Sequence, residues 1–349
     1  MYKKMKGERN FEHYTRSVPN KERKEFDPTS RKPAGEKSFG MIPNKIVNKL
    51  LDKSNSNVRG EASEMLQIEI ERSVKIREII PFLKSFLGFL SGLMEDINSR
   101  VVINILDTIL VLQKRLPTNM SGQMNLLIKM LLEINSDGKK EIKISVYQNV
   151  KQLMSNSPTQ AVVGELCEVA ATETDGRVRS EAVTLLSLAL LTFPRTALDL
   201  ATISQTAGRA LTDRRRRVRQ AGLECLALAA QCLGHHQARH RLTDFLAGLD
   251  RRARSHGQMV AAVRARLARK CLPRLTTEGL LDYGPAVPGP DLDWILAGSG
   301  PLSLHSAGGR QARTPSLPPL ATRRDLGSVG RIRSTRQRFS QSDSFYFYH

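Results

Sequence analysis

The sequence is poor in aromatic residues, in cysteine and in long apolar stretches. Aromatic side chains make up 5% of the 349 residues, with a single tryptophan, Trp294, whereas many β-sandwiches are richer in them. The four cysteines form no CxxC pair, and the polar start MYKKMKGERN does not resemble a signal peptide, so we expect reduced thiols in an intracellular protein. No uncharged apolar run reaches about 18 residues, so we expect no membrane-spanning helix.

Motifs for catalysis and cofactor binding are also missing. The sequence contains no GxxxxGK[ST] phosphate loop, no GxGxxG after a strand, no GxSxG and no HExxH. His236 and His240 have helical spacing near Cys232, but structural zinc needs four defined ligands and no carboxylate joins them. We therefore expect no enzymatic activity, no metal, no cofactor and no small-molecule substrate.

Negative charge is the scarcer sign. The chain carries 54 lysine and arginine residues against 34 aspartate and glutamate residues, a net charge of +20. Residues 209–274 hold 16 basic and 4 acidic side chains, and the excess is therefore concentrated toward the C-terminal end. Such a balance favours an acidic partner: nucleic acid, anionic lipid or an acidic protein.

An internal repeat organises the middle of the chain. A short polar loop is followed by a β-branched residue and an amphipathic helical pattern, six times over. The spacings of 43, 41, 36, 40 and 42 residues match the HEAT or armadillo period of about 40–47. The β-branched residues are Val58, Val101, Ile142, Val178, Val218 and Val260.

A second apolar helical pattern precedes each loop, and no segment shows sustained period-2 alternation. The sequence therefore predicts an all-α HEAT-repeat solenoid of six helical hairpins, with the β-branched residues in the core. Arg59, Arg179 and Arg219 follow that residue directly, and we expect them to form ion pairs between repeats with acids such as Asp175 and Asp213. A short ordered extension through Trp294 is expected to cap the last repeat.

The six loops are predicted to align along one edge of the solenoid, where function tends to lie. Their ranges are 53–57, 95–100, 135–141, 173–177, 213–217 and 254–258. Four consecutive arginines repel one another unless an anion faces them, so a basic binding ridge is preferred there over solubilising charge. The candidate residues of this ridge are Asn98, Arg100, Lys139, Lys140, Arg177, Arg214, Arg215, Arg216 and Arg217.

The array resembles a TOG domain. The stretch ALTDRRRRVRQAGLECLALAAQCLG resembles the fifth-repeat loop and helix of that family, and MVAAVRARLARKCLPRLTTEGLLDYGPAV followed by DLDWILAG resembles the end of a crescerin TOG domain. The resemblance covers roughly residues 42–298. It implies binding of αβ-tubulin or the microtubule lattice through the ridge residues, and a place in the cytoplasm, cytoskeleton, cilium or axoneme. The first loop, DKSNSNV, lacks the tryptophan that many TOG domains carry there, which leaves open whether free tubulin or the lattice is preferred.

Three segments are predicted: a disordered basic tail over residues 1–41, the TOG-like domain over 42–298, and a disordered tail rich in Arg, Ser and Pro over 299–349. Two alternative functions stay open. A generic HEAT scaffold for protein–protein interaction would need no basic ridge. Non-specific nucleic-acid binding would use the basic C-terminal segment, although stacking aromatics are few, which makes nucleic acid the less expected partner. No membrane partner is expected.

Overall fold

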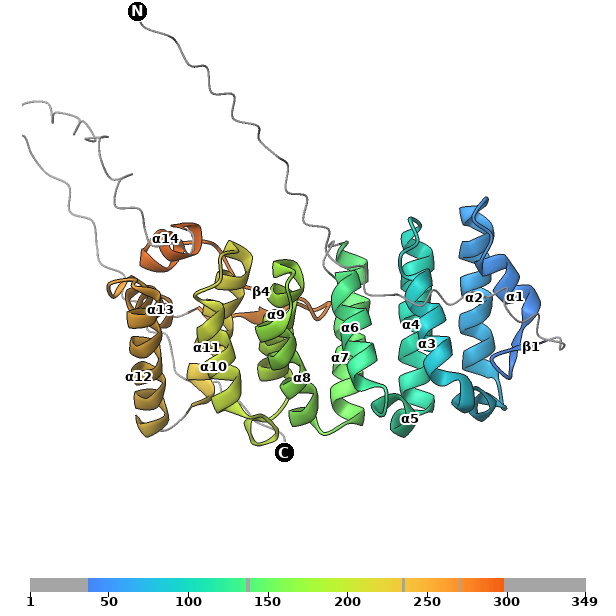
Figure 1. Ribbon diagram of the computed structural model, residues 1–349, viewed down its shortest axis with the longest axis horizontal. Coiled ribbons are helices and arrows are strands. Elements are labelled where there is room, and N and C mark those ends of the chain that lie inside the picture. Colours follow the sequence, from blue (N-terminus) through green and yellow to red (C-terminus); the bar gives the residue numbers. More distant parts are fainter. Residues whose placement is uncertain (1–36, 136–138, 234–235, 270, 298–349) are drawn as a thin grey trace, which may run out of the picture. The chain divides into compact units, whose positions relative to one another are not determined.

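A computed structural model describes residues 37–297, apart from residues 136–138, 234–235 and 270. All of these residues belong to one compact unit of the chain. The two predicted tails fall largely outside the described residues. Within the described part the chain forms six antiparallel helical hairpins arranged in a row (Figure 1). The prediction of an all-α HEAT-repeat solenoid is confirmed.

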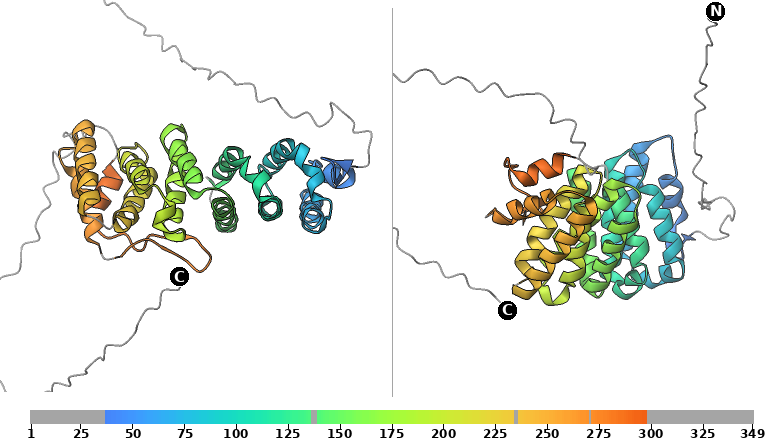
Figure 2. Two further views of the ribbon diagram at one scale, coloured as in Figure 1. Left: turned by 90° about the horizontal axis from the view of Figure 1, so that it is seen from below. Right: turned by 60° about the vertical axis from the view of Figure 1, so that its left-hand side comes forward.

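Each hairpin contributes one helix to each of two layers, as the views in Figure 2 show. The first helices are α1 (Asn44–Leu50), α3 (Leu83–Leu93), α6 (Met124–Asn135), α8 (Thr159–Thr172), α10 (Leu200–Ala210) and α12 (His236–Ala253). The second helices are α2 (Ser56–Arg72), α4 (Ser99–Arg115), α7 (Lys140–Asn156), α9 (Gly176–Thr192), α11 (Arg216–Cys232) and α13 (Gln258–Ala268). Successive second helices pack against one another, so the core is continuous from repeat to repeat.

Three short elements connect successive hairpins: η1 (Ile76–Phe82), α5 (Pro117–Ser121) and η2 (Arg195–Ala197). They lie along one edge of the row, at the bottom of Figure 1, which we call the connection edge. No helix among the described residues is both long and apolar enough to cross a membrane.

The β-branched residue at the start of each second helix anchors that helix in the core at the middle of the array. Val101 and Val218 are almost fully buried, and Ile142 and Val178 are also buried. Val58 and Val260 are only half-buried, in the first and the last repeat. The prediction therefore holds for the four inner repeats, which have a neighbour on each side.

Residues 37–41 are ordered, although the N-terminal tail was predicted to extend to residue 41. Strands β1 (Lys37–Ser38) and β2 (Ile42–Pro43) form a small antiparallel hairpin. Phe39 packs on aromatic rings of α3, and Met41 is buried. Gly40 has a φ of +83°, and a Cβ there would lie 2.5 Å from a backbone oxygen of η1. The ordered domain thus begins before the predicted boundary, because these apolar side chains join the core.

The chain after α13 folds back along the layer of second helices. Strands β3 (Arg274–Leu275) and β4 (Leu281–Asp282) pair in an antiparallel hairpin, and α14 (Pro290–Ala297) follows. β3 contacts α9, and α14 packs on both α13 and α11 (Figure 1). The extension therefore contacts the last repeat, as expected, and also continues past it as far as the third repeat, where Glu278 pairs with Lys140 of α7. We call residues 271–297 the fold-back segment.

Candidate functional site

The turns that join the two helices of each hairpin lie together along the edge opposite the connection edge, at the top of Figure 1. We call this the loop edge. Every residue of the predicted basic ridge lies in one of these turns or in the first turn of the helix that follows it. The shared architecture of the six hairpins brings these turns together, since each second helix starts at the same edge.

Asn98 has a structural role at the second turn of the loop edge. Its side-chain oxygen caps α4 by accepting a hydrogen bond of 3.0 Å from the amide of Arg100. Its amide nitrogen donates to the carbonyl of Ser56 in the first turn, at 3.2 Å. Asn98 therefore joins two neighbouring turns, and its side chain is only half exposed.

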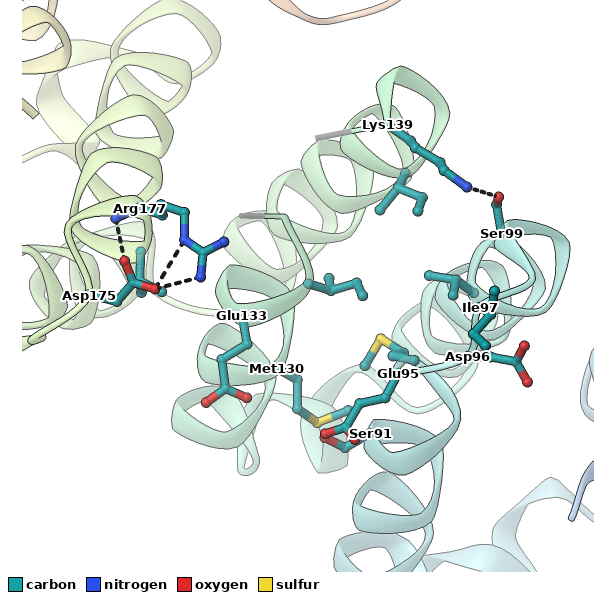
Figure 3. Close-up of a pocket in the computed structure, with 15 residues that line it drawn as sticks. Ser91, Glu95, Asp96, Ile97, Ser99, Met130, Glu133, Lys139, Asp175 and Arg177 are labelled. Atoms are coloured by element: carbon teal, nitrogen blue, oxygen red, sulfur yellow. Dashed lines mark hydrogen bonds and ion pairs between the residues drawn. The ribbon is translucent and has the colours of Figure 1, made fainter. Parts of the chain in front are cut away.

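The ridge cations of the second, third and fourth turns already have partners on this chain. Arg100 pairs with Glu64 at 2.5 Å, and Lys140 pairs with Glu278 at 2.8 Å. Lys139 donates to Ser99 Oγ at 2.6 Å, and Arg177 pairs with Asp175 at 3.2 Å (Figure 3). These contacts are exposed to solvent, so they contribute little to stability and are readily exchanged for an external anion.

Arg214, Arg215, Arg216 and Arg217 differ from the other ridge cations. All four side chains are exposed, and none forms an ion pair or a side-chain hydrogen bond within the part of the chain that the structure describes. They surround the N-terminus of α11, where the helix dipole disfavours positive charge. The carboxylate of Asp213 accepts from the amide of Arg215 there at 2.7 Å, but it is shared with Arg179. A bound anion would offset both the mutual repulsion and the dipole.

The fourth and fifth turns are in direct contact through Arg215. A Cβ added at Gly176 would lie 2.6 Å from Cγ of Arg215, so the arginine stem packs closely over this glycine and would have to shift for a larger residue. This packing holds Arg215 against the fourth turn. A cavity of about 460 Å³ opens there, lined by Asp175 and Arg177 of the fourth turn and by arginines of the fifth.

The arginines predicted to join repeats do so, with one change of partner. Arg179 of α9 pairs with Asp213 of the next turn at 2.7 Å, as predicted. Arg59 of α2 pairs in the same way with Asp96 at 2.5 Å. The hydrogen bond from Arg59 holds the pKa of Asp96 below its usual value. Both arginines also donate to carbonyls of their own turn, so each one joins two neighbouring turns.

Asp175 was predicted to take part in ion pairing between repeats, and this is wrong. It caps α9 by accepting from the amide of Arg177 at 2.8 Å, and it pairs with the side chain of the same residue. Both contacts lie within one turn, because Asp175 is the residue directly before the helix, where its carboxylate meets the free backbone amides. The hydrogen bonds to Arg177 hold the pKa of Asp175 below its usual value.

Arg219 contacts the fold-back segment. Its guanidinium donates to the carbonyls of Trp294, at 3.1 Å, and of Ile295, and also to two carbonyls of its own turn. The indole nitrogen of Trp294 in turn donates to the carbonyl of Leu211 at 3.1 Å. The fold-back segment is therefore fastened to the fifth turn, next to the four exposed arginines.

A double-mutant cycle on Arg179 and Asp213 should give a coupling free energy of about 1 kcal/mol in urea denaturation. The side chains are mostly buried, so removal of one leaves the other without its charged partner. The exposed pair of Arg274 and Asp282 is the control, with an expected coupling below about 0.5 kcal/mol. Equal coupling free energies in the two cycles would show that the ion pair between Arg179 and Asp213 stabilises the solenoid no more than an exposed ion pair does.

Sequence reasoning missed Ile97, whose side chain is 95% exposed on the loop edge. It lies beside a cavity of about 620 Å³ between the second, third and fourth turns, together with Met130, Lys139 and Arg177 (Figure 3). Ile97 is the one apolar residue of the otherwise polar loop EDINSR. A large apolar side chain in an exposed polar loop can mark a binding contact, so the sequence contained a signal for this position.

Comparison with known proteins points to one family. The chain is 31% identical over 308 residues to the human TOG array regulator of axonemal microtubules protein 1, which covers 83% of this chain and 18% of that protein. It is 24% identical to the crescerin-like protein che-12 of Caenorhabditis elegans, over 86% of this chain and 24% of that protein. The chain thus spans about a fifth of the length of the curated relatives that it matches. No protein-family model matches the sequence.

Solved structures of TOG domains are also similar to this chain. A crescerin structure, from a protein described as using a TOG domain array to regulate microtubules in the primary cilium, is 30% identical with a TM-score of 0.63. It covers 72% of this chain and 99% of its own. The N-terminal domain of MAST/Orbit is 16% identical with a TM-score of 0.51, covering 64% of this chain and 94% of its own, and it supports the fold alone.

Proposed function

Because the chain belongs to the crescerin family of TOG-domain proteins, we propose that it binds αβ-tubulin or the microtubule lattice through its loop edge. The observation that carries the proposal is the cluster of four exposed arginines without ion-pair partners among the described residues, on the same edge as the exposed Ile97. Charged and apolar groups together on one edge fit an acidic protein surface, because arginine pairs with carboxylates while the apolar side chain is desolvated.

The proposed contact set is the ridge together with Ile97. Arg214 to Arg217 make the first electrostatic contacts because their side chains are exposed and form no ion pair within the described residues. Ile97 supplies an apolar contact on an edge whose first loop has no tryptophan. The remaining members exchange exposed partners for groups on tubulin: Asn98, Arg100, Lys139, Lys140 and Arg177.

The proposed mechanism is binding and spatial organisation of tubulin, without covalent chemistry and without a cofactor. The relatives are named for axonemal microtubules and for the primary cilium, so we propose that the protein acts on the cytoskeleton, in the cytoplasm and in cilia. The domain that does so extends from about residue 37 to 298. The flanking basic segments, 1–36 and 299–349, add attraction to acidic surfaces that weakens with salt.

Replacing Ile97 with glutamate should weaken co-sedimentation of the full chain with microtubules at least about tenfold. The substitution places a carboxylate in an apolar contact and toward an acidic partner. The fold is not expected to change, because the side chain is 95% exposed. Size exclusion with free tubulin, run in parallel, identifies the preferred form of the partner.

The chain offers a matched control in Val74, which is also 95% exposed but lies on the connection edge. The Val74→Glu variant has the same charge change and should bind within about twofold of wild type. An equal loss in both variants, or no loss in either, would contradict docking through the loop edge. Absence of wild-type binding would redirect attention to a generic scaffold or to nucleic acid.

A further inference from the structure

The fold-back segment encloses a cavity of about 640 Å³ that the loop edge alone does not form. Its walls come from the first half of α11, from the end of α13 and from residues 283–296. The cavity is thus a product of the tertiary fold: α11 carries arginines of the ridge, and the opposite wall arrives from about 70 residues later in the sequence. We call it the C-terminal cavity.

The wall of the C-terminal cavity is held by two ion pairs. Arg266 pairs with Glu224 at 2.5 Å, and both side chains are buried. Arg269 pairs with Asp291 at 2.6 Å and also donates to the carbonyl of Val287, at 2.6 Å. The contacts of Arg269 hold the fold-back segment beside α13, and the two ion pairs together use both acidic side chains that line the cavity.

The charge that remains is positive. Arg216 and Arg217 line the cavity from α11, are exposed, and have no ion-pair partner in the described ranges. With the two acids neutralised by Arg266 and Arg269, the net charge of the lining is that of these two arginines. A ligand that matches this lining carries carboxylates or another anionic group.

The opposite wall is apolar and open to solvent. Leu296 is 58% exposed and Val287 is 48% exposed, which places them among the most exposed large apolar side chains of the described chain. Leu292 and Ile295 continue the same wall. Apolar side chains beside unpaired arginines define a ligand that is both acidic and apolar. Nucleic acid fits less well, since it needs exposed aromatic rings on which bases stack.

We propose that the C-terminal cavity binds an acidic peptide that carries an aliphatic side chain among its carboxylates. The carboxylates pair with Arg216 and Arg217, and the aliphatic side chain covers Val287 and Leu296. This site does not require the loop edge to bind tubulin. Arg216 and Arg217 also belong to the ridge. An unstructured acidic segment of a partner would pair with them in the cavity while its folded acidic surface meets the rest of the loop edge, and the partner would gain affinity because the two contacts are linked.

The test is fluorescence anisotropy of the full chain with a labelled ten-residue peptide of glutamates around two central leucines. We expect saturable binding that weakens about tenfold when the leucines become serine, and about tenfold in the Leu296→Asp variant. The Ile68→Asp variant is the matched control, because Ile68 is 45% exposed on α2, far from the cavity in sequence and in the row of hairpins. It should bind as wild type does.

Two results would overturn the proposal. One is no saturable binding of the leucine peptide by the wild-type chain. The other is equal binding of the leucine peptide, the serine peptide and a single-stranded oligonucleotide of the same charge, unaffected by Leu296→Asp, which would reduce the cavity to non-specific attraction. Microtubule co-sedimentation of Leu296→Asp separates this proposal from the loop-edge function, since lattice binding through the loop edge should persist when peptide binding is lost.

Discussion

Replacing Trp294 with alanine is expected to lower the free energy of unfolding by about 3 kcal/mol or more. Trp294 of α14 is 8% exposed, and its indole nitrogen donates to the carbonyl of Leu211. Truncation removes a large apolar surface from the core and leaves that carbonyl without its donor. Urea denaturation of the full chain, followed by circular dichroism, measures the loss.

A second variant separates packing from hydrogen bonding. Trp294→Phe keeps most of the apolar contact and removes only the donor, so a loss of about 1 kcal/mol is expected. Hydrogen exchange should also show faster exchange in the fold-back segment of the alanine variant, while α2 and α4 stay protected. A loss below about 1 kcal/mol for Trp294→Ala would mean that the fold-back segment does not depend on this anchor.

Replacing all four arginines at positions 214 to 217 with alanine in one variant should reduce the affinity for microtubules about thirtyfold at low salt. Each exposed arginine that meets a carboxylate contributes a fraction of a kcal/mol, and here four act on one surface without competing partners among the described residues. The difference between wild type and variant should shrink as salt rises, because these charges are screened. Co-sedimentation at two salt concentrations measures both effects.

The control removes four positive charges from near the connection edge. Its alanine substitutions leave the same net charge as the arginine variant, and they replace the exposed residues Arg72, Lys75, Arg77 and Arg195. This control should bind within about threefold of wild type if position decides the interaction. Equal losses in the two variants would show that total charge, and no particular edge, attracts the partner.

The spacing of apolar residues along the sequence predicted the hairpins well, because every helix pair buries a stripe of apolar residues with the same period. It also predicted the pairing of Arg179 with Asp213, since repetition places equivalent residues of neighbouring repeats side by side. The assignment of Asp175 was wrong because a residue directly before a helix is as well placed to cap that helix as to reach a neighbour.

The sequence predicted an ordered extension through Trp294 on the last repeat, but local sequence patterns did not predict the path of the fold-back segment over earlier repeats. Its two strands have two residues each and α14 has eight, too short for a periodic signal. Its position depends on contacts between residues far apart in sequence, such as Lys140 with Glu278 and Arg219 with the carbonyl of Trp294. The C-terminal cavity was therefore not predictable, although arginines on one of its walls were already candidates.

The most direct measurement is photo-crosslinking to microtubules. Two variants of the full chain carry the photo-reactive residue benzoylphenylalanine, one at position 97 and one at position 74, and each is irradiated in the presence of microtubules. Both positions are 95% exposed, one on the loop edge and one on the connection edge. Docking through the loop edge predicts a cross-link to tubulin from position 97 and none from position 74. Cross-links of equal yield from both positions, or from position 74 alone, would contradict it.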